Sequence, residues 1–161
     1  MQTTYEKLDI ETIEHSLRNS EDGISKLLDA KTSDGDSALH IACSAGRSDL
    51  VESLLKQRAD VFARNASGAT ALHAAASGGH SRSFMLLFRC LIICRCVAAL
   101  LEAGAAINAV TYTGQTPLYL SWSRNHPDCT AKLKSLGGSM NDNTPFDSKG
   151  SNHCDVCALY I

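Results

Sequence analysis

The 161-residue sequence predicts an all-α solenoid, in which short helix–turn–helix units stack in a line. The segment 38–42 (Ala-Leu-His-Ile-Ala) recurs 33 residues later as 71–75 (Ala-Leu-His-Ala-Ala), and a weaker copy, 116–120 (Thr-Pro-Leu-Tyr-Leu), follows. A fixed period of this length indicates a unit that buries its apolar face by stacking on its neighbours.

The composition is that of a globular protein and points away from several functional classes. The chain is 44% hydrophobic and 20% charged, with a formal net charge of -2, so no basic excess suggests a nucleic acid partner. Residues 1–19 lack the apolar core of a secretory signal. Seven cysteines without framework spacing therefore predict reduced thiols in the cytosol or nucleus, and we expect no cofactor and a monomer.

Each unit begins with a turn and a helix-capping residue. The units start at Thr32, Asn65 and Thr111, and each has a glycine at its fourth place and a hydroxyl residue at its sixth. A hydroxyl just before an apolar run is an N-cap signal, and Pro117 falls at the first helical position of the third unit. The glycines are Gly35, Gly68 and Gly114, and the capping residues are Ser37, Thr70 and Thr116.

Two helices follow each cap. The first is short and rich in small residues, and we expect it to end at Gly46, Gly79 and Asn125 in the three units. The second carries an apolar stripe, which is Leu50, Val51, Leu54 and Leu55 in the first unit, Val97, Leu100 and Leu101 in the second, and Cys129, Leu133 and Leu136 in the third. In the third unit Thr130 and Lys134 replace apolar residues, which predicts a face on which nothing stacks and hence a C-terminal cap.

These residues resemble the ankyrin repeat over about residues 8–138. The family pattern of a turn, Thr-Pro-Leu-His-x-Ala, a short helix, a glycine and a second helix followed by Gly-Ala appears here as residues 68–75 and 100–105. The resemblance implies that the protein binds another protein through a concave surface made by the turns and first helices. It also implies that His40 and His73 fix the turn before each helix by local hydrogen bonds.

The expected organisation has five parts. An N-terminal cap with two amphipathic helical faces precedes three repeats, the second of which carries an apolar insertion, and a tail rich in Asn, Asp, Ser and Gly is expected to be disordered. The parts are the cap 1–31, the first repeat 32–64, the second repeat 65–110 with its insertion 84–96, the third repeat or C-terminal cap 111–140, and the tail 141–161.

The insertion leaves several interpretations open. Gly68 and Gly114 lie 46 residues apart instead of 33, and removing residues 84–96 restores the register. In a continuous helix, thirteen extra residues rotate the next part of the helix by about 220°, so residues 84–88 and 97–101 cannot both occupy the same groove. The segment is interpreted as a retained in-frame intron, with a partner-binding helix or a membrane span over 84–101 as alternatives. Arg89 and Arg95 argue against the membrane span.

The candidate partner-binding residues are those expected at the turn tips and along the first helices. Tyr112 and Trp122 are the foremost candidates because aromatic side chains often anchor interfaces, and the alternative for Trp122 is a hydrophobic cap at the end of the stack. The full set is Ser33, Asp34, Asp36, Ser44, Ser67, Ala69, Ser77, Tyr112, Thr113, Gln115, Trp122 and Arg124.

No catalytic or metal site is predicted. No acidic residue or nucleophile recurs beside His40 and His73. The tail motif of His153, Cys154 and Cys157 supplies fewer ligands than a zinc site needs, although a metal-dependent or redox protein built on it is an alternative. The sequence therefore predicts a non-enzymatic adaptor, scaffold or assembly chaperone that binds a protein, with neither nucleic acid nor membrane as a partner.

Overall fold

The computed structural model describes residues 8–19, 21–78 and 95–140. Within these ranges the chain is helical, and an isolated bridge between Lys31 and Ser37 is the sole β-type pairing. The all-α prediction is thus confirmed. The helices are α1 (Ile10–Asn19), α2 (Glu21–Asp29), α3 (Ala38–Ser44), α4 (Ser48–Lys56), α5 (Ala71–Ser77), the helical residues 95–102, α7 (Pro117–Ser123) and α8 (Pro127–Ser135).

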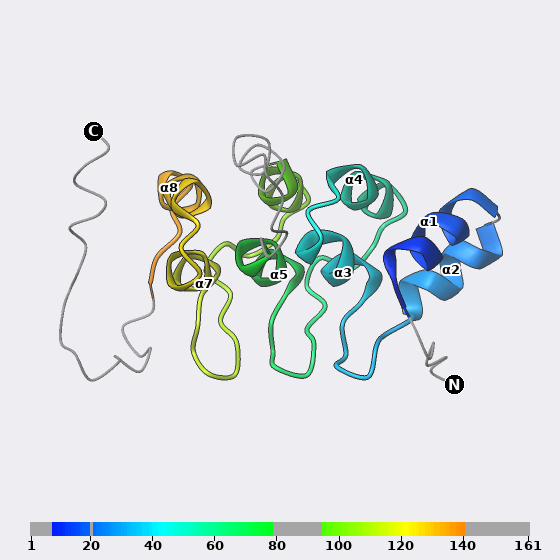
Figure 1. Ribbon diagram of the computed structural model, residues 1–161, viewed down its shortest axis with the longest axis horizontal. Helices are drawn as coiled ribbons and strands as arrows, with labels where there is room; N and C mark the ends of the chain where they lie inside the picture. The colour runs from blue at the N-terminus through cyan, green and yellow to red at the C-terminus, as the bar shows by residue number, and fades with distance from the viewer. Residues whose placement is uncertain (1–7, 20, 79–94, 141–161) are drawn as a thin grey trace.

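The helices form two layers, and the long turns that precede the first helices project in one direction (Figure 1). Helices α3, α5 and α7 make the first layer, and α5 packs between the other two. Helix α4, the helical residues 95–102 and α8 make the second layer. Three long turns extend below the first layer, and α1 and α2 cover the N-terminal end. This arrangement is the linear stack that the 33-residue period predicts.

The predicted helix starts are confirmed. Ser37, Thr70 and Thr116 hold extended backbone at the N-cap positions, and Pro117 is the first residue of α7. The predicted stops at Gly46 (φ 69°) and Asn125 (φ 57°) are also confirmed, because both adopt the left-handed backbone of a helix end. Gly79 lies outside the described residues, and α5 ends at Ser77.

The apolar stripes of the second helices form the core. Val51 and Leu54 are fully buried in the first unit, and Val97 and Leu100 are fully buried in the second. Cys96, which we placed at the end of the insertion, belongs to the same helix and is fully buried as well. The structure therefore seats residues 96–100 in the core, whereas residues 84–88 lie outside the described part.

The interpretation of Thr130 is wrong. We expected a polar residue on an uncovered face, but Thr130 is buried and its hydroxyl lies 2.9 Å from that of Ser121. These two residues stand where the first unit has Val51 and Ala42. Two hydroxyls in contact thus replace an apolar pair inside the third unit, while Lys134 is exposed as expected.

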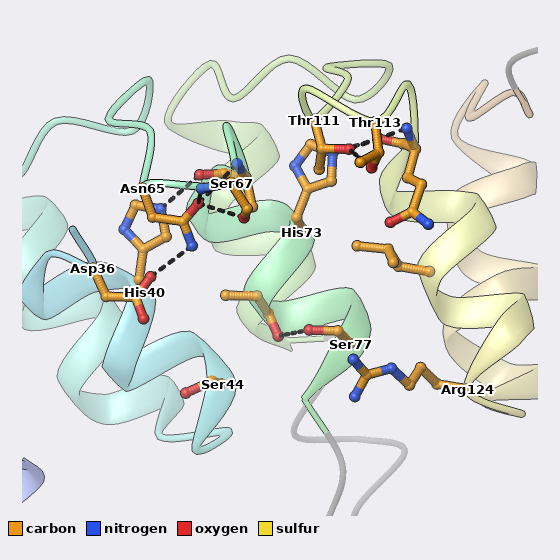
Figure 2. Close-up of a pocket in the computed structure, with 14 residues that line it drawn as sticks. Asp36, His40, Ser44, Asn65, Ser67, His73, Ser77, Thr111, Thr113 and Arg124 are labelled. Carbon is orange, nitrogen blue, oxygen red and sulfur yellow. Dashed lines mark hydrogen bonds between the residues drawn. The ribbon is translucent and has the colours of Figure 1, made fainter. Parts of the chain in front are cut away.

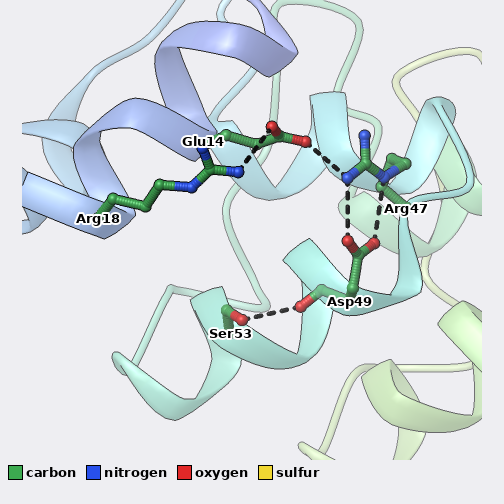
Figure 3. Close-up of polar contacts among 5 residues, drawn as sticks. All are labelled: Glu14, Arg18, Arg47, Asp49 and Ser53. Atoms are coloured by element: carbon green, nitrogen blue, oxygen red, sulfur yellow. Dashed lines mark hydrogen bonds and ion pairs between the residues drawn. The ribbon is translucent and has the colours of Figure 1, made fainter.

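Buried apolar side chains and an ion pair attach the N-terminal helices to the first unit. Ile13 of α1 and Leu27 of α2 are buried in the common core. Arg47, just before α4, donates to Glu14 of α1 at 2.6 Å and to Asp49 at 2.9 Å (Figure 3). The hydrogen bonds from Arg47 hold the pKa of Asp49 below its ordinary value of 3.8. One guanidinium therefore links the N-terminal helices to the first repeat, in a partly exposed position where salt weakens the pairing.

Candidate functional site

The three turns share one hydrogen-bond pattern. In each, the backbone N–H of the first residue donates to the carbonyl of the fifth, as Thr32 does to Asp36 at 2.9 Å. The side chain of the first residue accepts from the fifth N–H, through Thr32 Oγ1, Asn65 Oδ1 and Thr111 Oγ1. A polar residue at the first place therefore closes the loop in every unit.

Neighbouring turns are joined to one another. The N–H of Ala66 donates to the Asp34 carbonyl at 2.9 Å, and the N–H of Tyr112 donates to the Ser67 carbonyl at 3.0 Å. A Cβ placed on Gly68 would lie 2.9 Å from the Tyr112 ring. The glycine thus leaves room for that ring against the second turn.

His40 and His73 connect each unit to the next. The Ser37 N–H donates to His40 Nδ1 at 3.3 Å, so Nε2 carries the proton and donates to the Ala69 carbonyl of the second unit at 3.0 Å. His73 repeats this with the Thr70 N–H and the Gln115 carbonyl of the third unit. Both rings are buried. Their expected role in fixing the turn before the helix is confirmed, and the structure adds a bond between units.

A groove of about 300 Å³ runs across the three units, between the turns and the first helices (Figure 2). Eight of the twelve candidate residues line it, and they come from all three units. These are Asp36, Ser44, Ser67, Ala69, Ser77, Thr113, Gln115 and Arg124. Sequence reasoning missed six further lining residues, which are His40, Asn65, His73, Ala74, Thr111 and Leu120.

Four candidates lie outside this lining. Ser33 and Asp34 are exposed on the first turn, and Tyr112 on the third turn is 74% exposed. Trp122 is 44% exposed and its ring is tilted against Tyr119, with centroids 6.0 Å apart. It occupies the place of Cys43 and Ala76 in the earlier units, both of which are buried. Trp122 therefore belongs to the end of the stack instead of the groove.

The described residues offer little reactive chemistry. Burial raises the pKa of the Cys43 thiol above its ordinary value of 9.0 and that of the Cys96 thiol to about 11, so both stay protonated. Across residues 8–19, 21–78 and 95–140, no group of three or more His, Cys, Asp or Glu side chains is placed to hold a metal ion. The motif of His153, Cys154 and Cys157 lies outside these residues.

Among the described segments, no helix has the length and hydropathy needed to cross a bilayer. The membrane alternative for 84–101 falls mostly outside them.

Fold and groove together define a stacked helical-repeat protein with a groove that three successive units line. The family described as ankyrin repeats (3 copies) matches residues 5–93, more than half of the chain. The protein belongs to the ankyrin repeat family. Proteins of this family use their repeats as interaction modules that bind other proteins, typically without catalysis.

Curated relatives from a plant and two animals are similar to part of this chain. The chain is 30% identical over 139 residues to the E3 ubiquitin-protein ligase KEG of Arabidopsis thaliana, covering 72% of this chain and 9% of the ligase. It is 33% identical to the tyrosine-protein kinase HTK16 of Hydra vulgaris over 65% of this chain and 12% of the kinase. It is 32% identical to the nuclear factor NF-kappa-B p105 subunit of Gallus gallus over 70% of this chain and 10% of that protein. The chain thus spans about a tenth of each of these relatives.

Proposed function

We propose that the protein is a non-catalytic interaction module that binds a partner protein along the groove between its turns and first helices. The observation that carries this proposal is the groove itself, to which side chains from three successive units contribute. Its lining combines hydroxyls, amides, imidazoles and one charge of each sign with the hydrocarbon of two alanines and a leucine, and such a mixture of polar and apolar groups is typical of protein interfaces.

The finer form of the proposal concerns the biological role. Residues 38–46 and 108–110, together with 114–118, resemble stretches of gankyrin, a proteasome-assembly chaperone. We therefore propose an adaptor, scaffold or assembly chaperone that acts in the cytosol or nucleus. We retain the division into cap, three repeats, inserted segment and tail, with the insertion as a retained intron.

The test is affinity capture followed by mass spectrometry, with a matched pair of variants. Ser44 and Ser135 are both exposed serines whose hydroxyls donate to a carbonyl of their own helix, at 3.0 and 2.8 Å. Ser44 lines the groove, whereas Ser135 lies on α8. A protein captured by wild type and by Ser135→Arg, and lost with Ser44→Arg, supports the proposal.

A companion variant tests the turn tip. Tyr112→Ala removes the largest exposed side chain beside the groove, and we expect it to weaken capture of the same protein. Partners captured equally by all four proteins would place recognition elsewhere and refute the groove as the binding site.

A further inference from the structure

The charged residues of the groove stand at its opposite ends. Asp36 belongs to the first turn and Arg124 follows α7 in the third unit, and Figure 2 shows them on opposite sides of the groove. They are the charged side chains among the lining residues, since the others carry hydroxyls, amides, imidazoles or hydrocarbon. The exposed Asp34 lies on the same turn as Asp36 and adds negative charge there. The groove is therefore negatively charged at its first-unit end and positively charged at its third-unit end.

The groove between these ends presents hydrogen-bond acceptors. The hydroxyls of Ser44 and Ser77 donate to the carbonyls of Ile41 and Ala74 within their own helices. The Ser67 hydroxyl donates to Asn65 Oδ1 at 2.7 Å. With their protons used internally, these oxygens retain lone pairs, which suit the backbone N–H groups of an extended peptide.

The distance between the two charges sets the length of a matching ligand. Packed helices lie about 8–10 Å apart, so α3 and α7 are separated by about 16–20 Å across α5. Asp36 precedes α3 and Arg124 follows α7, which adds an offset of about 10 Å along the helix axis and makes the diagonal about 19–23 Å. An extended chain advances about 3.3 Å per residue. Two side chains that face Asp36 and Arg124 are therefore about six or seven residues apart in such a ligand.

We propose that the groove selects an extended segment of a partner protein with a basic side chain at the Asp36 end and an acidic side chain at the Arg124 end. The two side chains are about six or seven residues apart. This inference rests on the proposed function, because it takes the groove as the binding site. It adds the chemistry and the orientation of the bound segment to that function.

The experiment is selection of random twelve-residue peptides on the immobilised full-length protein, followed by affinity measurement on synthetic peptides. We expect enriched peptides to carry opposite charges at that spacing. Exchanging the acidic residue of such a peptide for lysine weakens its binding to wild type by about three- to tenfold, as expected for a partly exposed ion pair turned into a like-charge contact.

Two variants invert or remove the preference. Arg124→Glu is expected to bind the lysine-exchanged peptide better than the original one. Asp36→Asn keeps an oxygen to accept from Asn65 Nδ2, a 2.8 Å bond in the wild type, and removes the charge, so the preference for the basic residue should vanish. Lys132→Glu on α8 makes the same charge change as Arg124→Glu at an exposed site away from the groove, and should behave as wild type.

The outcomes separate this inference from the proposed function. Peptides that bind, are lost with Ser44→Arg and show no charge pairing would overturn the inference and leave the groove as a binding site. Failure to enrich any peptide would overturn the inference as well. Peptides that bind Ser44→Arg as tightly as wild type would instead refute the groove.

Discussion

The buried hydroxyl pair of the third unit has too few protons for its contacts. Ser121 Oγ lies 2.8 Å from the Leu118 carbonyl, Thr130 Oγ1 lies 2.8 Å from the His126 carbonyl, and the two hydroxyl oxygens lie 2.9 Å apart. Two protons serve these three contacts. One contact is therefore always an oxygen–oxygen approach without a hydrogen bond, and the pair stabilises the unit less than its three short distances imply.

The two hydroxyls face each other in a buried site, and this contact predicts non-additive effects on stability. Ser121→Ala or Thr130→Val alone leaves one buried hydroxyl facing a methyl group, and each should lower the free energy of unfolding by about 0.5–1.5 kcal/mol. The double variant installs the Ala–Val pair that the first unit already has as Ala42 and Val51. Because replacing both polar partners is close to neutral, it should unfold within about 0.5 kcal/mol of wild type. The implied coupling is about 1–2 kcal/mol.

Urea unfolding followed by far-UV circular dichroism measures this cycle, provided that the dependence on urea stays unchanged. Ser123→Ala is the control, because Ser123 is exposed on the same helix and its hydroxyl also donates to a carbonyl three residues earlier, at 3.1 Å. It should leave stability unchanged or raise it slightly. A double variant that loses the sum of the two single losses would refute the reasoning, since the hydroxyls would then act independently.

Three further predictions concern backbone and charge. Gly68→Ala and Gly104→Ala both place a side chain at positive φ, but only at Gly68 does the new Cβ meet another residue, the Tyr112 ring. Backbone strain should lower the free energy of unfolding by roughly 1 kcal/mol in both variants. Thermal or urea unfolding should show a larger decrease for Gly68→Ala, and equal decreases would contradict the contact with Tyr112. Arg58 adopts φ 62° where the second and third units have glycine, so Arg58→Gly should raise the free energy of unfolding by about 0.5–1 kcal/mol, and a decrease would count against this explanation. Burial lowers the pKa of His73 below its ordinary value of 6.5, so the folded state binds fewer protons than the unfolded state. The contribution of His73 to the free energy of unfolding should therefore be full above pH 6.5 and fall on acidification. Urea unfolding at several pH values measures this decrease, which should be less steep in His73→Gln.

The repeating features of the fold were predictable because each rests on local chemistry. Thr116 and Pro117 specify a helix start through a hydroxyl cap and a preset φ, whatever surrounds them. Val97 was aligned with Val51 only by restoring the 33-residue spacing, and the structure buries both residues. The family match runs to residue 93 and stops before Val97.

The rest depended on neighbours that one sequence does not reveal. Thr130 was taken for an outward-facing residue because a single polar substitution has no visible partner until Ser121 is known to lie opposite. The lining residue Asn65 was missed although a signal existed, because the first place of every unit is polar, as Thr32 and Thr111 also show. The Asn65 side chain closes its own turn, and this position also places it beside the groove.

Trp122 has a consequence for how these molecules meet one another. Stacked repeats can in principle associate end to end, because the surface that joins two neighbouring units could also join the last unit of one molecule to the first unit of another. The two internal junctions bury Cys43 or Ala76, and a bulky indole at the corresponding spot keeps an incoming copy from settling at the same depth. We therefore expect this single large ring to disfavour another unit that packs on the third as the third packs on the second.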